Sequence, residues 1–383
     1  MDFEQIMPSV VPTFWLLVKI IVIFASALQI VPLLIWLERK VVADFQVRIG
    51  PNRIGPFGLL QPLADAVKLM MKEDITPAGA DKPLYFLAPI MSIVPAVMAL
   101  GVIPWGPLPW MRITDLNHSL LYSFAISSVS VYAVAIAGWA SNNKYSLMGA
   151  LRASSQMISY ELGMGLSLIA LVMVTQSLSL REIVEYQHLH GWNIIAGGQH
   201  IDVVATALQG SAPAPGQLAM IVTFIGLAIS MIVAFFIYII CGIAETNRAP
   251  FDLAEAESEL IAGFHTEYSS FKFAIFFMAE YVNMVVVSAL ATTLFLGGWS
   301  GPGISYDPAT GQLAGGIPMA LLALGYFLAK VFFFLYLYMW LRATLPRFRY
   351  DSLMQFGWKA LLPLSLANIF FVGMFVAWRS GWF

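Results

Sequence analysis

The stretch FAIFFMAEYVNMVVVSALATTLFL, from Phe273 to Leu296, carries a single charged side chain, Glu280. A helix needs roughly 20 mainly apolar residues to cross a bilayer core about 30 Å thick, so this stretch predicts a transmembrane helix. Seven further runs of similar length carry no charge or only isolated charges: Phe14–Leu37, Leu84–Pro104, Leu120–Ala140, Met157–Leu178, Leu218–Ile240, Met319–Trp340 and Leu353–Ala377. We therefore predict an all-α polytopic membrane protein, with about eight transmembrane helices and cytoplasmic amphipathic helices in a single transmembrane domain over residues 1–383.

The composition supports this class. Hydrophobic residues make up 59% of the chain and charged residues only 11%, a balance typical of membrane proteins. The chain starts MDFEQIMP, with Asp2 and Glu4 where a secretory signal would have basic residues. We therefore expect the first apolar run to remain as a helix.

The basic residues predict the orientation of the helices. Loops after the odd-numbered helices hold fourteen Lys and Arg near the helix ends, whereas loops after the even-numbered helices hold only Arg112 and Arg181. Lys and Arg are enriched in cytoplasmic loops, so the first set of loops is predicted to face the cytoplasm. Both termini are then predicted to lie on the outer face.

The sequence offers few ligands for the common redox cofactors, such as iron–sulfur clusters and haem. Cys241 is the single cysteine, and an iron–sulfur cluster held by four thiolates needs four. The five histidines are predicted at helix ends or in loops, so no pair could hold a haem within the spans. No Gly-rich dinucleotide loop follows a strand pattern, and we predict no metal site. Any electrons would therefore come from a partner.

The first cytoplasmic loop, residues 38–82, contains an amphipathic segment. Leu59, Leu63, Val67 and Met70 recur at helical spacing opposite polar residues that include Asp65 and Lys68. One interpretation is a surface helix that lies on lipid or on the bundle. The other is the floor of an entrance for an amphiphilic substrate, with Asp65 and Lys68 facing it.

The third cytoplasmic loop, residues 241–272, is strongly acidic. The segment contains only two basic residues and six carboxylates, which are Glu245, Asp252, Glu255, Glu257, Glu259 and Glu267. Such a loop is usually solvated. The same segment is too apolar for a floppy tail, however, and carboxylates crowded in a partly desolvated place would hold or pass protons near neutral pH.

Four ionisable residues are predicted within the spans: Lys19, near an outer end, and Glu161, Glu280 and Lys330 at greater depth. A charge near the bilayer centre costs about 2.5 to 3.5 kcal/mol, so each should face a partner, the bundle interior or a water-filled cavity. One interpretation is a proton path. The alternative is a structural Glu–Lys pair between helices.

Five stretches together resemble one family: LERK at 37–40, RIGPNRIGPFGLLQPLADAVKLMMKE at 48–73, SQMISYELG at 155–163, AETNRAPFDLAEAESELIAGFHTEYSSFKFAIFFMAEY at 244–281, and RATLPRFRYDSLMQFGWK at 342–359. They are similar to one membrane subunit of proton-translocating NADH:quinone oxidoreductase, respiratory complex I. It is called the H subunit in bacteria and subunit 1 in mitochondria. The resemblance covers nearly the whole chain.

The resemblance implies a subunit of an enzyme that is not catalytic alone, set in a bacterial inner membrane. It would enclose much of a chamber through which ubiquinone or menaquinone enters, and couple quinone reduction to proton translocation. By motif, the chamber would include Glu38, Arg39, Arg48, Arg53, Asp65, Lys68, Asp252 and Glu255. The proton path would include Glu161, Glu245, Glu257, Glu259 and Glu280, to which the insertion-cost argument adds Lys330.

The resemblance also implies partners and cofactors. No redox cofactor would be bound by this chain, and quinone would be the substrate. Flavin and iron–sulfur clusters would lie on peripheral-arm subunits, and antiporter-like membrane subunits would receive the protons. Three rival interpretations are a stand-alone transporter with inverted repeats, the related subunit of a membrane-bound hydrogenase, and a passive assembly scaffold.

Overall fold

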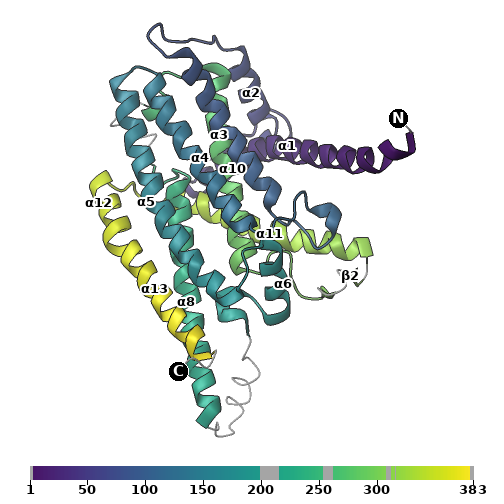
Figure 1. Cartoon of the computed structure of the whole chain (residues 1–383). Helices are drawn as coiled ribbons and strands as arrows, with labels where there is room; N and C mark the ends of the chain where they lie inside the picture. The colour runs from purple at the N-terminus through teal and green to yellow at the C-terminus, as the bar shows by residue number, and fades with distance from the viewer. Residues whose placement is uncertain (1–2, 199–214, 253–261, 308–311, 315, 380–383) are drawn as a thin grey trace.

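The computed structural model of the chain describes residues 3–198, 215–252, 262–307, 312–314 and 316–379 (Figure 1). The structure is helical apart from two short antiparallel strands, β1 (Tyr306–Asp307) and β2 (Gln312–Leu313). The α-helices are α1 (Phe3–Phe45), α2 (Gln61–Met71), α3 (Lys82–Val102), α4 (Ser119–Ala140), α5 (Lys144–Thr175), α6 (Leu180–His190), α8 (Pro215–Glu245), α10 (Ser270–Phe295), α11 (Gly316–Thr344), α12 (Tyr350–Phe356) and α13 (Leu362–Arg379).

Eight helical segments of the described residues are long and apolar enough to cross a membrane, which confirms the predicted all-α polytopic fold. Seven of them are single helices: α1, α3, α4, α5, α8, α10 and α11. The eighth runs from Tyr350 to Trp378 and joins α12 to α13 through a π-helical turn at Gly357–Leu361.

Helix α10, which the opening stretch predicted, lies at the centre of the molecule. It contacts α1, α2, α3, α8 and α11, and 61% of its most apolar window is buried within the chain, more than in any other span of the described residues. A helix that is apolar all round belongs in an interior, because no face of it favours water. Its few polar side chains therefore have partners on neighbouring helices and on the segments that connect them.

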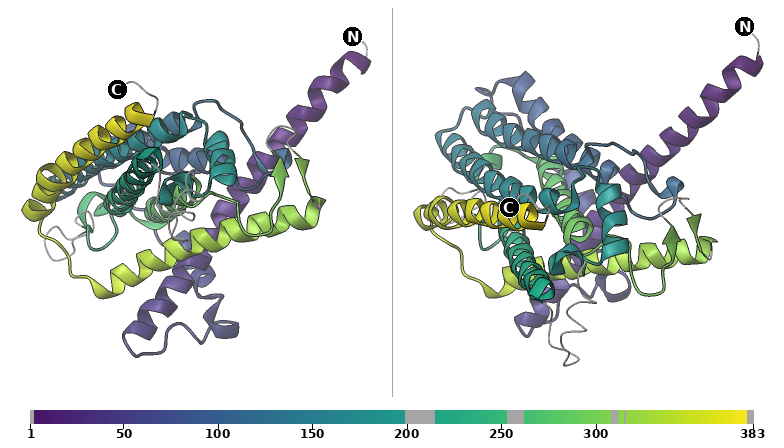
Figure 2. Two further views of the ribbon diagram at one scale, coloured as in Figure 1. Left: turned by 90° about the horizontal axis from the view of Figure 1, so that it is seen from below. Right: turned by 60° about the horizontal axis from the view of Figure 1, so that its bottom comes forward.

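Helices α1 and α11 contact each other and run at a steep angle to α4, α5, α8 and α13 (Figures 1 and 2). The structure extends α1 to Phe45, past Glu38, where the sequence predicted that the first loop begins. It likewise extends α8 to Glu245, into the predicted acidic loop. Both extensions carry charged residues that find partners on other helices, so the charges do not end the helix.

The amphipathic segment of the first loop forms α2, as predicted. Its apolar side chains are largely exposed within this chain: Leu63 is 59% exposed, Val67 51% and Met70 65%. Helix α2 contacts α1 on one side and α10 on another. An apolar face on a helix at the end of the bundle is available to lipid or to another amphiphile.

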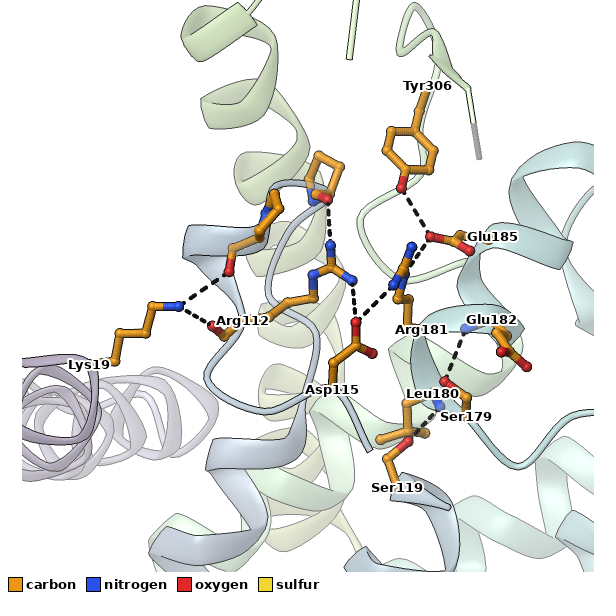
Figure 3. Close-up of polar contacts among 12 residues, drawn as sticks. Lys19, Arg112, Asp115, Ser119, Ser179, Leu180, Arg181, Glu182, Glu185 and Tyr306 are labelled. Atoms are coloured by element: carbon orange, nitrogen blue, oxygen red, sulfur yellow. Dashed lines mark hydrogen bonds and ion pairs between the residues drawn. The ribbon is translucent and has the colours of Figure 1, made fainter. Parts of the chain in front are cut away.

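The end of the bundle opposite α2 carries a polar network that holds α1 in place (Figure 3). The Lys19 ammonium donates to the carbonyl of Arg112 at 2.8 Å. The Arg112 guanidinium pairs with Asp115 at 3.2 Å, Asp115 pairs with Arg181 at 2.8 Å, and Arg181 pairs with Glu185 at 2.8 Å. The ammonium that the sequence placed near an outer end of a span is therefore bound by the loop between α3 and α4, and through it to α6.

Candidate functional site

A charge cluster surrounds the buried carboxylate of Glu38 on α1, a residue that is 6% exposed. The Tyr281 hydroxyl donates to Glu38 Oε2 at 2.7 Å, and the Arg342 guanidinium donates to Oε1. The Arg248 guanidinium lies 3.7 Å from Oε1 and stacks over the Tyr281 ring at 4.2 Å. The cluster joins α1, α10, α11 and the segment after α8.

Two guanidinium groups oppose one carboxylate in this cluster. A buried carboxylate is tolerated only when paired and hydrogen-bonded, and Glu38 has both kinds of partner. Counted by formal charge and over these three described residues alone, Glu38, Arg248 and Arg342 sum to one positive charge. The cluster can therefore stabilise negative charge that arrives or develops beside it.

Two other residues assigned to the chamber by motif, Arg39 and Asp65, form an ion pair. Arg39 Nη1 lies 2.6 Å from Asp65 Oδ2, which ties α1 to α2. Arg48, Arg53 and Lys68 are exposed and do not join the Glu38 cluster.

Asp252 is buried and accepts a hydrogen bond from Arg347 Nη2 at 2.9 Å. This ion pair fastens the segment after α8 to the segment after α11, and the Phe348 amide donates to the Pro250 carbonyl beside it. The remaining carboxylates of the acidic loop that the sequence assigned to the site, Glu255, Glu257 and Glu259, lie outside the described residues.

A second polar site lies inside the bundle. Glu245 and Glu280 line one cavity of about 20 Å³, together with Ser92, Ser130, Asn247 and Asn283. A polar cavity of this size has room for one water molecule, which needs about 10 to 15 Å³. Among the described residues, Glu245 Oε2 has no hydrogen-bond partner. The cavity therefore brings two of the predicted carboxylates together around a space that a water could bridge.

Glu161 lies next to this site. It accepts a hydrogen bond from Ser128 Oγ and interacts electrostatically with Glu245. Glu161 also lines an apolar groove of about 680 Å³ between α4, α5 and Trp358. Glu245 is thus linked to both of the other predicted carboxylates, to Glu280 through the shared cavity and to Glu161 through their electrostatic interaction.

Lys330 is separate from these carboxylates. Its ammonium donates to the carbonyls of Leu296, Gly298 and Ser300 at 2.7, 2.9 and 2.7 Å, beyond the last turn of α10. It also lies 4.7 Å from the centre of the Trp192 ring. An ammonium has three donors, and the carbonyls occupy all three. The Glu–Lys pair that we considered from the sequence is therefore not the role of Lys330.

Arg248, Tyr281 and Arg342 were missed as site residues at the level of sequence. Each stood inside a quoted motif, yet basic and aromatic residues near helix ends are common, so nothing in the pattern singled them out. The one available signal was adjacency, because Tyr281 directly follows Glu280, a carboxylate predicted within a span. Within the described part of the chain, no group of three or more His, Cys, Asp or Glu side chains is placed to hold a metal ion.

Comparison with known proteins identifies the family. The family model described as NADH dehydrogenase matches residues 18–373. The chain is 46% identical over 380 residues to the NADH-quinone oxidoreductase H subunit numbered 2 of Koribacter versatilis, covering 94% of this chain and 96% of that protein. It is 46% identical to the H subunit numbered 1 of Solibacter usitatus (95% and 97% covered) and 45% identical to the H subunit of Leptospira biflexa (95% and 96% covered). The chain therefore belongs to the family of NADH-quinone oxidoreductase H subunits, which are membrane subunits of respiratory complex I.

Proposed function

We propose that this chain walls a quinone-access chamber beside the Glu38 cluster and couples quinone reduction to proton transfer through the intramembrane carboxylates. The observation that carries the proposal is the position of two consecutive residues of α10. Tyr281 donates to Glu38 in the charge cluster, and Glu280 lines the cavity with Glu245. One rigid helix thus reaches both sites, so a change of charge at the first can alter the second.

The chamber side of the proposal rests on α1 and α2. The Arg39–Asp65 pair joins them, and α2 presents exposed apolar side chains beside it. A quinone has a polar headgroup and an apolar tail, so a surface with both characters suits it. To this chamber we assign Glu38, Arg39, Arg48, Arg53, Asp65, Lys68, Asp252 and Glu255.

The electrostatic step follows from the surplus positive charge around Glu38. Reduction of a quinone places negative charge on its oxygens until protons arrive. Arg248 and Arg342 would be drawn toward that charge and would weaken their hold on Glu38. The Tyr281 hydroxyl, which donates to Glu38, would then shift, and the part of α10 that carries Glu280 would shift with it.

The proton path would run between Glu245 and Glu280 across the shared cavity and continue to Glu161. A water held by Asn247 and Asn283 would be the bridge, because proton transfer needs donor and acceptor within hydrogen-bond reach or one water apart. Glu257 and Glu259 would exchange protons at the start of the path. We assign Lys330 a supporting position at the end of α10.

The chain would work only within the whole complex. We propose that it binds no redox cofactor, that flavin and iron–sulfur clusters lie on peripheral-arm subunits, and that antiporter-like subunits receive the protons. From the basic loops we infer that the end with α2 would face the cytoplasm, in a bacterial inner membrane. Both termini would then lie on the outer face.

The test replaces Glu280 by Gln, and separately Glu161 by Gln, in the assembled complex in membrane vesicles. Glutamine keeps the shape but cannot release a proton. We expect the complex to assemble while proton translocation, and with it coupled quinone reduction, falls. Glu182→Gln is the matched control, because Glu182 is an exposed carboxylate on α6 that accepts from Ser177. Full pumping in both Glu280→Gln and Glu161→Gln would remove these residues from the path.

A further inference from the structure

Lys272, in the first turn of α10, has a nearly buried ammonium in a site of its own. Its side chain is 9% exposed, and Nζ lies 2.9 Å from Asp74 Oδ1 and 3.1 Å from Thr76 Oγ1. The ammonium also sits over two aromatic rings of α3, 4.7 Å from the centre of Tyr85 and 4.6 Å from that of Phe86. The site therefore joins α10, α3 and the segment that follows α2.

The two serines just before Lys272 bind the same segment. Ser269 Oγ accepts from the Ile75 amide at 2.8 Å and donates to the Ile75 carbonyl at 3.3 Å. Ser270 Oγ donates to the carbonyl of Leu69, in the last turn of α2, at 3.0 Å. The start of α10 thus holds the chain from Leu69 to Thr76 through four side-chain hydrogen bonds and one ion pair.

The other polar tie of α2 is weaker. The Arg39–Asp65 pair is 47% and 32% exposed, and exposed ion pairs contribute little because water competes for both partners. In the Lys272–Asp74 pair the Asp74 side chain is 53% exposed, so this ion pair by itself is also weak. The Lys272 ammonium is shielded from water, however, and it also contacts a hydroxyl and two ring faces. The position of α2 relative to α10 is therefore set at the start of α10, where Lys272 acts together with Ser269 and Ser270.

We propose that Lys272 is a positioning residue for the quinone reaction: it fixes the amphipathic helix α2 against α10, and so sets the distance between the floor of the quinone chamber and the helix that carries Tyr281 and Glu280. The inference rests on the proposed function and extends it to a residue outside both sites. Lys272 stands eight residues before Glu280, about 12 Å along the helix. The contact therefore joins α2 to α10 directly, without passing through the Glu38 cluster.

The experiment uses the assembled complex with Lys272→Met, Lys272→Arg, Asp74→Asn and the double variant Lys272→Met/Asp74→Asn. Lys82→Met is the matched control, since Lys82 is an exposed lysine at the start of neighbouring α3. A soluble short-tailed ubiquinone is the probe, and KM, kcat and the protons moved per electron are measured. For Lys272→Met we expect KM to rise about tenfold, with kcat within about twofold of wild type. The proton ratio should be unchanged, because Glu245, Glu280 and Glu161 are intact.

Lys272→Arg should recover most of the KM, since it keeps the charge near Asp74 and the rings. The double variant should be no worse than Lys272→Met, because the two residues act through one contact. A KM equal to that of Lys82→Met, a fall confined to kcat, or additive effects of the two changes would overturn the proposal. If Lys272→Met fails to assemble, Asp74→Asn decides alone, through the same rise in KM or its absence.

The outcome is separable from that of the proposed function. Arg39→Gln and Asp65→Asn probe the chamber directly. A KM shift in those variants with none in Lys272→Met or Asp74→Asn refutes the positioning role and leaves the chamber standing. No KM shift in any of the four variants refutes both.

Discussion

Replacing Ser130 by valine should block proton transfer between Glu245 and Glu280 by filling the cavity between them. The cavity measures about 20 Å³, and Ser130 lines it from α4. Valine puts methyl groups where the serine has one hydroxyl, and a methyl is about the size of the single water that fits there. The bridge would lose a hydrogen bond to each carboxylate, together about 3 kcal/mol, which slows transfer about a hundredfold.

The assay compares proton translocation and quinone reduction in vesicles containing the assembled complex. Ser130→Ala is the control, because it also loses the 2.6 Å bond from Ser130 Oγ to the Ser127 carbonyl but leaves the cavity open. We expect Ser130→Ala to pump almost normally and Ser130→Val to lose coupling. Extra bulk costs about 1 to 3 kcal/mol of stability, so the amount of assembled complex is measured in parallel. Normal pumping by assembled Ser130→Val would refute the water bridge.

Two further predictions concern residues outside this cavity. Burial lowers the pKa of His265 from 6.5 to about 4. Between these two pH values the unfolded chain therefore binds a proton at His265 and the folded chain does not. The free energy of unfolding should therefore have its full value above pH 6.5 and should decline as the pH falls toward 4, by about 3 kcal/mol. In His265→Gln the thermal unfolding temperature should depend less on pH between neutral pH and about pH 4.5. A pH dependence equal to that of the wild type would contradict the assignment. Lys330→Met removes the donor to three carbonyls and should lower the thermal stability of the complex by about 3 kcal/mol or more. The complex that still assembles should move the same number of protons per electron. Lost coupling at unchanged stability would instead indicate that Lys330 belongs to the proton path.

The membrane spans could be predicted from the sequence because the length of an apolar run directly measures the hydrocarbon that a helix must cross. The ends of α1 and α8 could not be predicted in this way. The charged stretch after Leu37 suggested a loop, yet the helix continues because Glu38 is neutralised by Arg342, 304 residues away. A helix end that depends on such a distant partner leaves no local pattern.

The charges within the spans could be predicted from the sequence, but their partners could not. The cost of insertion marks Glu161, Glu280 and Lys330 equally, since it depends only on depth and charge. It cannot distinguish a carboxylate facing a polar cavity from an ammonium held by carbonyls. That distinction depends on the loop after α10, whose turn at Gly297 and Gly298 uses positive φ angles of 73° and 54° to bring the carbonyls around Lys330.

Two widely separated attachments of α1 limit how this helix can move. Lys19 is bound to the loop between α3 and α4, and Glu38 is bound to α10 and α11, nineteen residues further on. The attachments are about 28 Å apart along the helix axis. A helix held at two points this far apart cannot slide or turn about its axis, but the stretch between the two points can bend sideways. Any lateral opening beside α1 should therefore widen and narrow between Lys19 and Glu38, while the ends of that interval stay in place.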